Sequence, residues 1–152
     1  MLALDSSTFV EIMRARNRTV QQAFMALDTE QSPVVASVLV LHELLSGARL
    51  GDNPAGERAK VERVLRGIDV VALEPSDIEF TAKVRADLRR QGRPIGDVDA
   101  LIAGQALARG WTLVTRNVKH FGRVEGLSLI DWAVGPEPLS AEAVAARVRE
   151  GE

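Results

Sequence analysis

Cysteine is absent from this chain of 152 residues, and histidine occurs only twice. The absence of cysteine excludes disulfides and thiolate metal sites, and it is compatible with a reducing cytoplasm. A metal ion must therefore be bound by oxygen atoms, or by one of only two imidazole rings. Long apolar runs are lacking as well. The longest one, from Val34 to Leu41, is interrupted by Ser37 and is far too short to span a bilayer.

The sequence also lacks a targeting signal and a strong charge. Its start, MLALDSS, has neither the basic region nor the long apolar core of a signal peptide, so we expect a soluble, cytoplasmic protein without a membrane partner. A formal net charge of −2 argues against attraction to nucleic acid by the chain as a whole, although a local basic rim is compatible with it. A length of 152 residues and a hydrophobic content of 46% suit one globular domain with a real core.

The stretch from Gly96 to Asn117 is the most informative part of the sequence. It divides at Gly110 into a helix pattern and a strand pattern. A glycine at this place predicts a left-handed helix cap and a tight turn into the strand from Trp111 to Thr115. Polar side chains follow at the strand end, and ligands of an open parallel sheet bind outside the carboxyl ends of its strands. We therefore expect the chemistry at this edge of the sheet.

Short apolar strands alternate with helices along the rest of the chain. The other expected strands are Met1–Leu4, Val34–Ala36, Asp69–Leu73 and Leu127–Ile130. The other expected helices are Thr8–Arg16, Thr19–Glu30, Val38–Leu50, Glu57–Arg66 and Asp77–Gln91. This alternation predicts an α/β fold with a parallel sheet of four to five strands and helices on both faces.

The character of the sequence changes at Ala133. Glycine and proline interrupt any regular element there, and Leu139 to Arg149 then form a short, alanine-rich helix pattern. We expect residues 1–132 to form the domain and residues 133–152 to be a C-terminal appendage.

Four acidic residues stand where a parallel sheet can bring them to one edge. They are Asp5 at the end of the first strand, Glu43 in an apolar helix, and Asp97 and Asp99 in the first turn of a later helix. Carboxylates that crowd together repel one another, so either their pKa values rise or a divalent cation compensates their charge. Oxygen ligands without cysteine suit Mg²⁺, for which Mn²⁺ can substitute. Such a site supports attack of a metal-activated water on a phosphodiester.

Each acid also has an ordinary structural explanation. Asp5 is placed to cap a helix, and Glu43 fits an exposed helical position. Asp97 and Asp99 are favourable anions at a helix N-terminus. The combination of the four, rather than any one of them, indicates a metal site.

Five segments carry a resemblance to a known family. They are LALDSS at 2–7, LVLHELLSG around Glu43, IGDVDALIA at 95–103, LVTRN at 113–117 and KHFGRVEGLSLIDW at 119–132. The chain resembles a PIN domain in these segments, and within that family the VapC-type ribonuclease toxins of bacterial toxin–antitoxin pairs. The resemblance implies a three-layer PIN-like fold and a Mg²⁺-dependent endoribonuclease that hydrolyses RNA. It also implies a homodimer and a cognate VapB-type antitoxin, which would block the acidic cleft with a segment carrying Arg or Lys.

The resemblance assigns roles to the acids of the expected site. Asp5, Glu43 and Asp99 would be the metal ligands and catalytic acids. Asp97 is an additional acid that would assist, cap the helix, or bind metal in place of Asp99. Asn117 stands where many relatives have a fourth acid, and it would orient a water or a ligand without adding charge.

Supporting roles fall to three hydroxyls and two cations. The hydroxyls of Ser6, Ser7 and Thr115 would hydrogen-bond to the metal-binding carboxylates. Arg116 and Lys119 would contact the RNA. The two histidines are assigned no role in this chemistry.

Three other interpretations share the acidic pocket. A phosphatase of the haloacid dehalogenase type needs a second Asp two residues after its nucleophile, where this sequence has Ser7. A receiver-like signalling module needs adjacent acids after the first strand and a Lys after the last, and the sequence has Ser6 and Asp131 there. A PIN fold that binds RNA or a partner without cutting it stays open, because intact ligands do not establish turnover.

Overall fold

The computed structural model describes residues 1–28 and 30–151, and its centre is a parallel sheet of five short strands. The strands are β1 (Leu2–Leu4), β2 (Val34–Ser37), β3 (Asp69–Val71), β4 (Thr112–Val114) and β5 (Ser128–Ile130). Their order across the sheet is β3-β2-β1-β4-β5, and every neighbouring pair is parallel. The predicted α/β fold is confirmed. The chain order reverses between β1 and β4, and such a switch point is where ligands bind in sheets of this kind.

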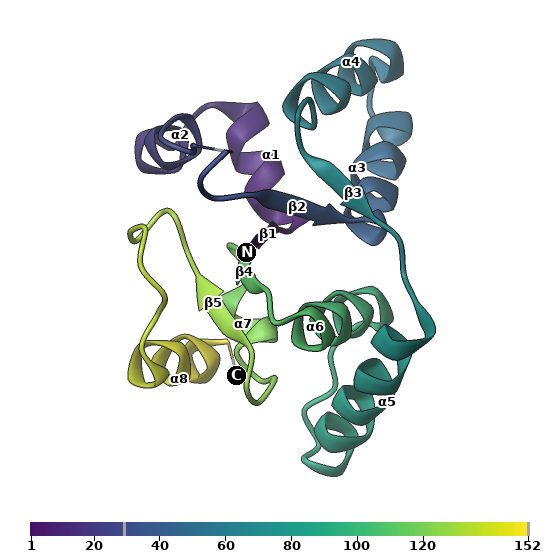
Figure 1. Cartoon of the computed structure of the whole chain (residues 1–152), viewed down its shortest axis with the longest axis vertical. Helices are drawn as coiled ribbons and strands as arrows, with labels where there is room; N and C mark the ends of the chain where they lie inside the picture. Colours follow the sequence, from purple (N-terminus) through teal and green to yellow (C-terminus); the bar gives the residue numbers. More distant parts are fainter. Residues whose placement is uncertain (29, 152) are drawn as a thin grey trace.

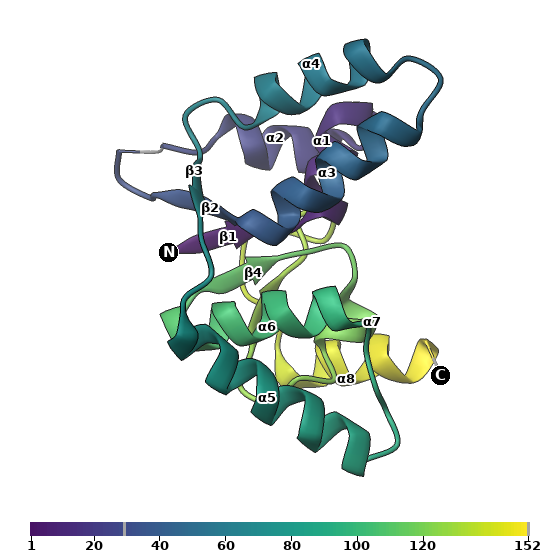
Figure 2. The same cartoon turned by 90° about the vertical axis from the view of Figure 1, so that its right-hand side faces the viewer.

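Helices cover both faces of this sheet (Figure 1). They are α1 (Ser6–Arg14), α2 (Arg18–Met25), α3 (Val38–Leu50), α4 (Pro54–Val64), α5 (Pro75–Arg90), α6 (Asp97–Arg109), α7 (Val118–Phe121) and α8 (Ala141–Glu150). Figure 2 shows α1 to α4 on one side of the sheet and α5 to α8 on the other. Within the described part of the chain, no helix has both the length and the apolar character that crossing a membrane requires.

The helix boundaries differ from the sequence prediction where capping decides them. Helix α4 begins at Pro54, three residues before the expected start at Glu57, because the Asn53 side chain accepts from the Gly56 amide at 3.2 Å. Helix α2 ends at Met25, whereas the prediction extended it to Glu30 and so through residue 29, which lies outside the described residues. The four-residue helix α7 was not predicted, because so short an element shows no helical period.

Helix α6 carries Asp99 in its first turn, and two contacts fix the position of this helix. Gly104 allows a close approach to α5: a Cβ there would lie 2.6 Å from the Thr81 amide nitrogen, a distance that real contacts do not reach. At the other end of α6, Arg109 binds the buried Asp77 carboxylate with two hydrogen bonds of 2.9 Å. Both contacts fix α6 against α5, and they thereby fix the position of its N-terminal turn.

The C-terminal segment packs on the domain rather than extending away from it. The Leu139 amide donates to the Leu129 carbonyl at 2.8 Å, and Val148 of α8 is buried. Helix α8 contacts α7 closely, since a Cβ on Gly122 would lie 2.7 Å from methyl groups of Val144 and Val148. Residue 152, the last of the expected appendage, lies outside the described residues. The division at residue 132 stays a prediction.

Candidate functional site

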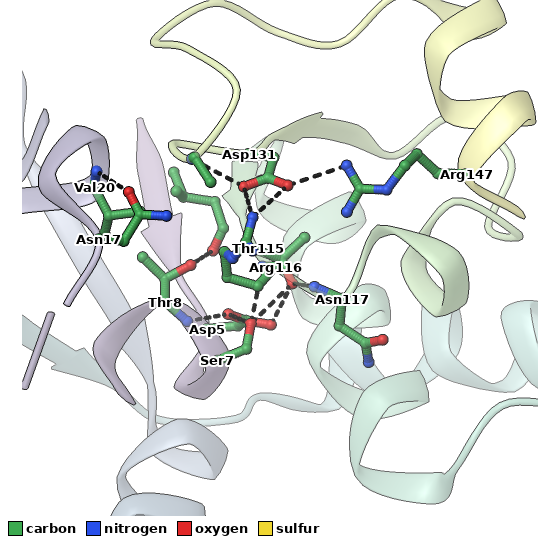
Figure 3. A network of polar contacts seen from close by, with 12 residues as sticks. Asp5, Ser7, Thr8, Asn17, Val20, Thr115, Arg116, Asn117, Asp131 and Arg147 are labelled. Atoms are coloured by element: carbon green, nitrogen blue, oxygen red, sulfur yellow. Dashed lines mark hydrogen bonds and ion pairs between the residues drawn. The ribbon is translucent and has the colours of Figure 1, made fainter. Parts of the chain in front are cut away.

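The site lies at the switch point between β1 and β4. Leu4 pairs with Val114, and Val114 pairs with Ile130, so the last residues of three neighbouring strands lie in one row. The residues that follow, Asp5, Thr115 and Asp131, therefore project from the same edge of the sheet, and all three are buried. Figure 3 shows them joined in one polar network.

Asp5 is the centre of this network. As the cap of α1, it accepts at Oδ1 from the Thr8 amide at 3.1 Å and from the Ser7 hydroxyl at 2.6 Å. Its Oδ2 accepts from the Thr115 hydroxyl at 2.5 Å. Only 3% of Asp5 is exposed, and this burial raises the pKa of its carboxyl to about 6, although the hydrogen bonds from Ser7, Thr115 and Thr8 lower it.

The two hydroxyls that bind Asp5 also bind the loop after β4. Ser7 Oγ accepts from the Arg116 amide at 2.9 Å, and Thr115 Oγ1 accepts from the Asn117 amide at 2.9 Å. Each hydroxyl thus donates to the carboxylate and accepts a backbone N–H, so its hydrogen-bonding capacity is used from both sides. These hydrogen bonds connect the end of β1 to the end of β4 through the Asp5 carboxylate.

Glu43 and Asp99 approach Asp5 from two different helices. Glu43 lies in the second turn of α3, where the Ser6 hydroxyl donates to its Oε1 at 3.0 Å, and burial raises the pKa of its carboxyl. Burial also raises the pKa of Asp99, while the neighbouring His120 lowers it. The charge of Asp99 raises the pKa of both Asp5 and Glu43, so the three carboxyls interact electrostatically.

Asp97 lies outside this group. Its side chain is 75% exposed and forms an ion pair with Arg85 of α5 at 3.1 Å. Two residues correspond to about 200° of rotation around a helix, so Asp97 and Asp99 point in nearly opposite directions. The exposed acid and the inward acid of this turn can therefore be tested separately.

Asn117 and His120 border the site on the side of Asp99. The side-chain nitrogen Nδ2 of Asn117 lies 3.0 Å from Nδ1 of His120, and the same ring nitrogen lies 3.5 Å from Oδ2 of Asp99. One nitrogen cannot both accept from the amide and donate to the carboxylate, so the two contacts need different placements of the hydrogen on the ring. Sequence reasoning gave His120 no role; its position one helical turn after Asn117 was the available signal. His42 is exposed.

Arg116 is held by a carboxylate that sequence reasoning did not assign to the site. Its Nη1 donates to both oxygens of Asp131, at 2.9 and 3.0 Å, and Arg147 of α8 donates to Oδ2 at 3.1 Å. The position of Asp131 directly after β5 was a signal for it, whereas nothing local pointed to Arg147. Lys119 is exposed on α7 and lies beside Gly151 at the end of α8.

The donor set of the three carboxyls fits a hydrated divalent ion. Across residues 1–28 and 30–151, no three acidic, histidine or cysteine side chains lie close enough together to enclose a metal ion. Mg²⁺, however, keeps several waters and is commonly held by one or two carboxylates together with substrate phosphates. The pKa values of Asp5, Glu43 and Asp99 are raised because burial disfavours their negative charges. A bound cation would compensate these charges.

Comparison with known proteins identifies the family. The model of the PIN domain family matches residues 2–127. The tRNA(fMet)-specific endonuclease VapC of Shigella flexneri is 34% identical over 130 residues, which are 86% of this chain and 96% of that protein.

Solved structures agree with this match. The DNA-bound VapBC of Salmonella typhimurium has a chain that is 30% identical, with a TM-score of 0.78 and coverage of 86% of this chain and 97% of that one. VapBC2 of Rickettsia felis, bound to a DNA fragment from its promoter, has the same fold, with a TM-score of 0.79 at 24% identity and coverage of 86% and 98%. The chain belongs to the PIN domain family and, within it, to the VapC-type toxin ribonucleases.

Proposed function

We propose that this chain is a Mg²⁺-dependent endoribonuclease toxin that uses Asp5, Glu43 and Asp99 to cut single-stranded or looped RNA. One observation carries the assignment: the carboxyls of Asp5 after β1, Glu43 in α3 and Asp99 in α6 all have pKa values raised by burial, and the charge of Asp99 raises the pKa of the other two further. Structural caps and surface acids do not require such burial next to another carboxylate. The relative from Shigella is named for tRNA(fMet), so this tRNA is the first substrate to test.

The acids, the hydroxyls and Asn117 have different roles in the proposed reaction. Asp5, Glu43 and Asp99 would hold the ion, which when bound would activate a water and stabilise the leaving oxygen. Ser7 and Thr115 fix the two oxygens of Asp5, so that this carboxylate does not have to reorganise during the reaction. Asn117 would orient a water or a phosphate oxygen through its side-chain amide.

The neighbouring acids of α6 provide a matched test. Asp99→Asn is expected to lower the rate of RNA cleavage at least about 100-fold, because it removes an inward charge where the cation binds. Asp97→Asn is expected to stay within about threefold of the parent, because this acid faces Arg85 and solvent. Gel assays of tRNA(fMet) cleavage with Mg²⁺, with Mn²⁺ and with EDTA measure both rates.

Two results would count against the proposal. Equal losses of cleavage rate in Asp99→Asn and Asp97→Asn would mean that the assignment of Asp99 as a metal ligand is wrong. A parent protein that binds RNA in Mg²⁺ and Mn²⁺ without cutting it would favour the binding protein without turnover.

We also propose a cognate VapB-type antitoxin as the partner. A pocket of about 580 Å³ opens beside Glu43 between α1, α3 and α4, and its lining includes Ser6, Met13 and Lys60. The wall is partly apolar and carries acids and cations, and Lys60 is bound by Glu57 at 3.0 Å, so Glu43 is the carboxylate that we propose to receive an Arg or Lys of the antitoxin. The relatives solved as VapBC complexes support this partner. An RNA substrate and such a partner place the proposed activity in the cytoplasm.

We expect the antitoxin to be encoded immediately upstream of this chain, and co-expression with it tests the partner. We expect one complex on size-exclusion chromatography, with RNA cleavage suppressed until the antitoxin is removed.

The mass of the toxin alone tests the homodimer. We propose that the homodimer forms through the segment from Thr19 to Leu50, where Met25 and Leu50 are strongly exposed. Separate elution of the two proteins would contradict the first claim, and a monomeric toxin the second.

A further inference from the structure

The C-terminal helix brings a second guanidinium to the edge of the site. Arg116 and Arg147 both bind the Asp131 carboxylate, which is completely buried, while their own side chains are 33% and 32% exposed. Arginine is always protonated, so two guanidiniums that share one carboxylate leave one positive charge without a partner in the cluster. The right-hand part of Figure 3 shows Arg147 reaching from α8 to this carboxylate.

The hydrogen-bonding capacity of the pair is only partly used. Both guanidiniums bind Asp131 through Nη1 alone, although each carries five N–H donors. The Nε of Arg116 is buried and has no hydrogen-bond partner among the described residues.

The pair lies beside the three carboxyls. Asp131 and Asp5 follow strands that are separated only by β4, so their backbones are about 10 Å apart at the usual spacing of strands. The Arg116 amide binds Ser7, which in turn binds Asp5. An RNA strand whose scissile phosphate lies at Asp5 can therefore continue along the sheet edge to the two arginines.

Positive charge at this place matters because the three carboxyls of the site carry charge of the same sign as RNA. Asp5, Glu43 and Asp99 are all acidic, and the whole chain has a net charge of −2. The family model ends at residue 127, so Arg147 and the helix that carries it lie beyond the matched domain. The tail after Trp132 thus adds a second guanidinium to the carboxylate that Arg116 of the domain binds.

We propose that Arg116 and Arg147 together bind a backbone phosphate of the RNA next to the one that is cut, with α8 supplying the second guanidinium. The inference rests on the proposed ribonuclease function. Guanidinium groups suit this ligand because their planar donors match phosphate oxygens with two parallel hydrogen bonds.

RNA binding at several salt concentrations tests the pair without relying on cleavage. All proteins carry Asp5→Asn, so that a labelled single-stranded oligonucleotide stays intact during anisotropy measurements. Arg147→Met keeps the aliphatic stem against the domain and removes the charge. It is expected to weaken binding about tenfold at 0.1 M salt and to reduce the slope of log K against log salt by about 0.7, the value for one phosphate contact on a single strand.

Two further variants separate the charge at this position from the helix itself. Arg149→Ala removes an exposed cation from the same helix and is expected to change neither the slope nor, beyond about twofold, the affinity. Arg147→Lys keeps the charge and is expected to keep the slope, with part of the affinity lost because the planar fork is gone.

The outcomes separate this inference from the function on which it rests. An unchanged salt slope in Arg147→Met overturns the phosphate site, even if the melting temperature falls or antitoxin binding weakens, because those losses show only a structural or partner role. Equal slopes for Arg147→Met and Arg149→Ala overturn it as well. If the slope falls but the protein with Asp5 restored does not cut RNA, the phosphate site stands and the ribonuclease function fails.

Discussion

Asp5→Asn is expected to lower RNA cleavage at least about 1,000-fold and, in metal-free protein at pH 7.5, to raise the free energy of unfolding. The loss of activity follows from the position of Asp5, where two hydroxyls and a backbone amide hold the carboxylate at the switch point. The gain in stability follows from its burial. Asparagine has nearly the same shape, and its carbonyl oxygen in the place of Oδ1 still accepts the two hydrogen bonds from Ser7 and Thr8, so the fold is retained.

The sign of the stability change comes from the raised pKa. Burial raises the pKa of Asp5 from 3.8 to about 6, so between these pH values the native state binds more protons than the unfolded state. Stability is therefore lost as the pH rises through this window. Above pH 6 the ionised carboxylate costs the native state about 3 kcal/mol, at 1.4 kcal/mol for each pKa unit. Asparagine removes this cost but rearranges one hydrogen bond, which leaves a gain of about 1–2 kcal/mol.

Urea unfolding in EDTA at pH 7.5 and at pH 5 measures this gain. The advantage of Asp5→Asn is expected to be largest at pH 7.5 and to shrink at pH 5, and added Mg²⁺ is expected to stabilise the parent alone. Asp97→Asn is the control, with a change below about 0.5 kcal/mol at both pH values because this acid is exposed. If Asp5→Asn were less stable than the parent at pH 7.5, the account of a strained carboxylate at this position would be wrong.

Cleavage at limiting Mg²⁺ is expected to fall about tenfold for each pH unit below pH 6, and more steeply if a second carboxyl must also lose its proton. Protons and the cation compete for the same oxygens, so apparent metal affinity falls as Asp5 is protonated. The pKa values of Glu43 and Asp99 are also raised by burial, so these acids act in the same direction. Higher Mg²⁺ is expected to restore the rate at pH 5.

Cleavage rates at pH 5, 6, 7 and 8 across a series of Mg²⁺ concentrations check this expectation. Circular dichroism at each pH is the control for folding, and Asp5 itself favours the folded state at the lower pH values. A rate at limiting Mg²⁺ that does not change between pH 5 and pH 8 would contradict a site in which carboxylates hold the cation. So would a loss at pH 5 that no concentration of Mg²⁺ reverses.

Parts of the site that depend on local pattern could be predicted from the sequence. Asp5 follows one short apolar strand, and Thr115 follows another. Because parallel strands end at the same side of a sheet, this pattern predicted that both side chains lie at one edge. Asp99 could have been separated from Asp97 by helical phase, since Ala103 and Ala106, four and seven residues after Asp99, lie on its side of α6 and are buried.

Contacts between distant segments could not be predicted in this way. Arg147 binds Asp131, which lies 16 positions earlier in the sequence, and the segment between them contains two prolines. Such a segment has no periodic pattern from which its packing on the domain could be predicted. His120 lies in a helix of four residues, too short for a hydrophobic repeat. The start of α4 was readable from Asn53-Pro54, a cap followed by a proline at the first helical position, but the sequence interpretation assigned these residues to a loop.

The placement of β1 in the middle of the sheet affects how this protein is made. The first strand to leave the ribosome pairs with β2 on one side and with β4 on the other, so its second neighbour is synthesised more than 100 residues later. Asp5 is therefore synthesised well before Asp99 and Thr115. A nascent chain that has not yet reached residue 99 therefore lacks one of the three acids, and one that has not yet reached residue 115 lacks the hydroxyl that binds Oδ2 of Asp5.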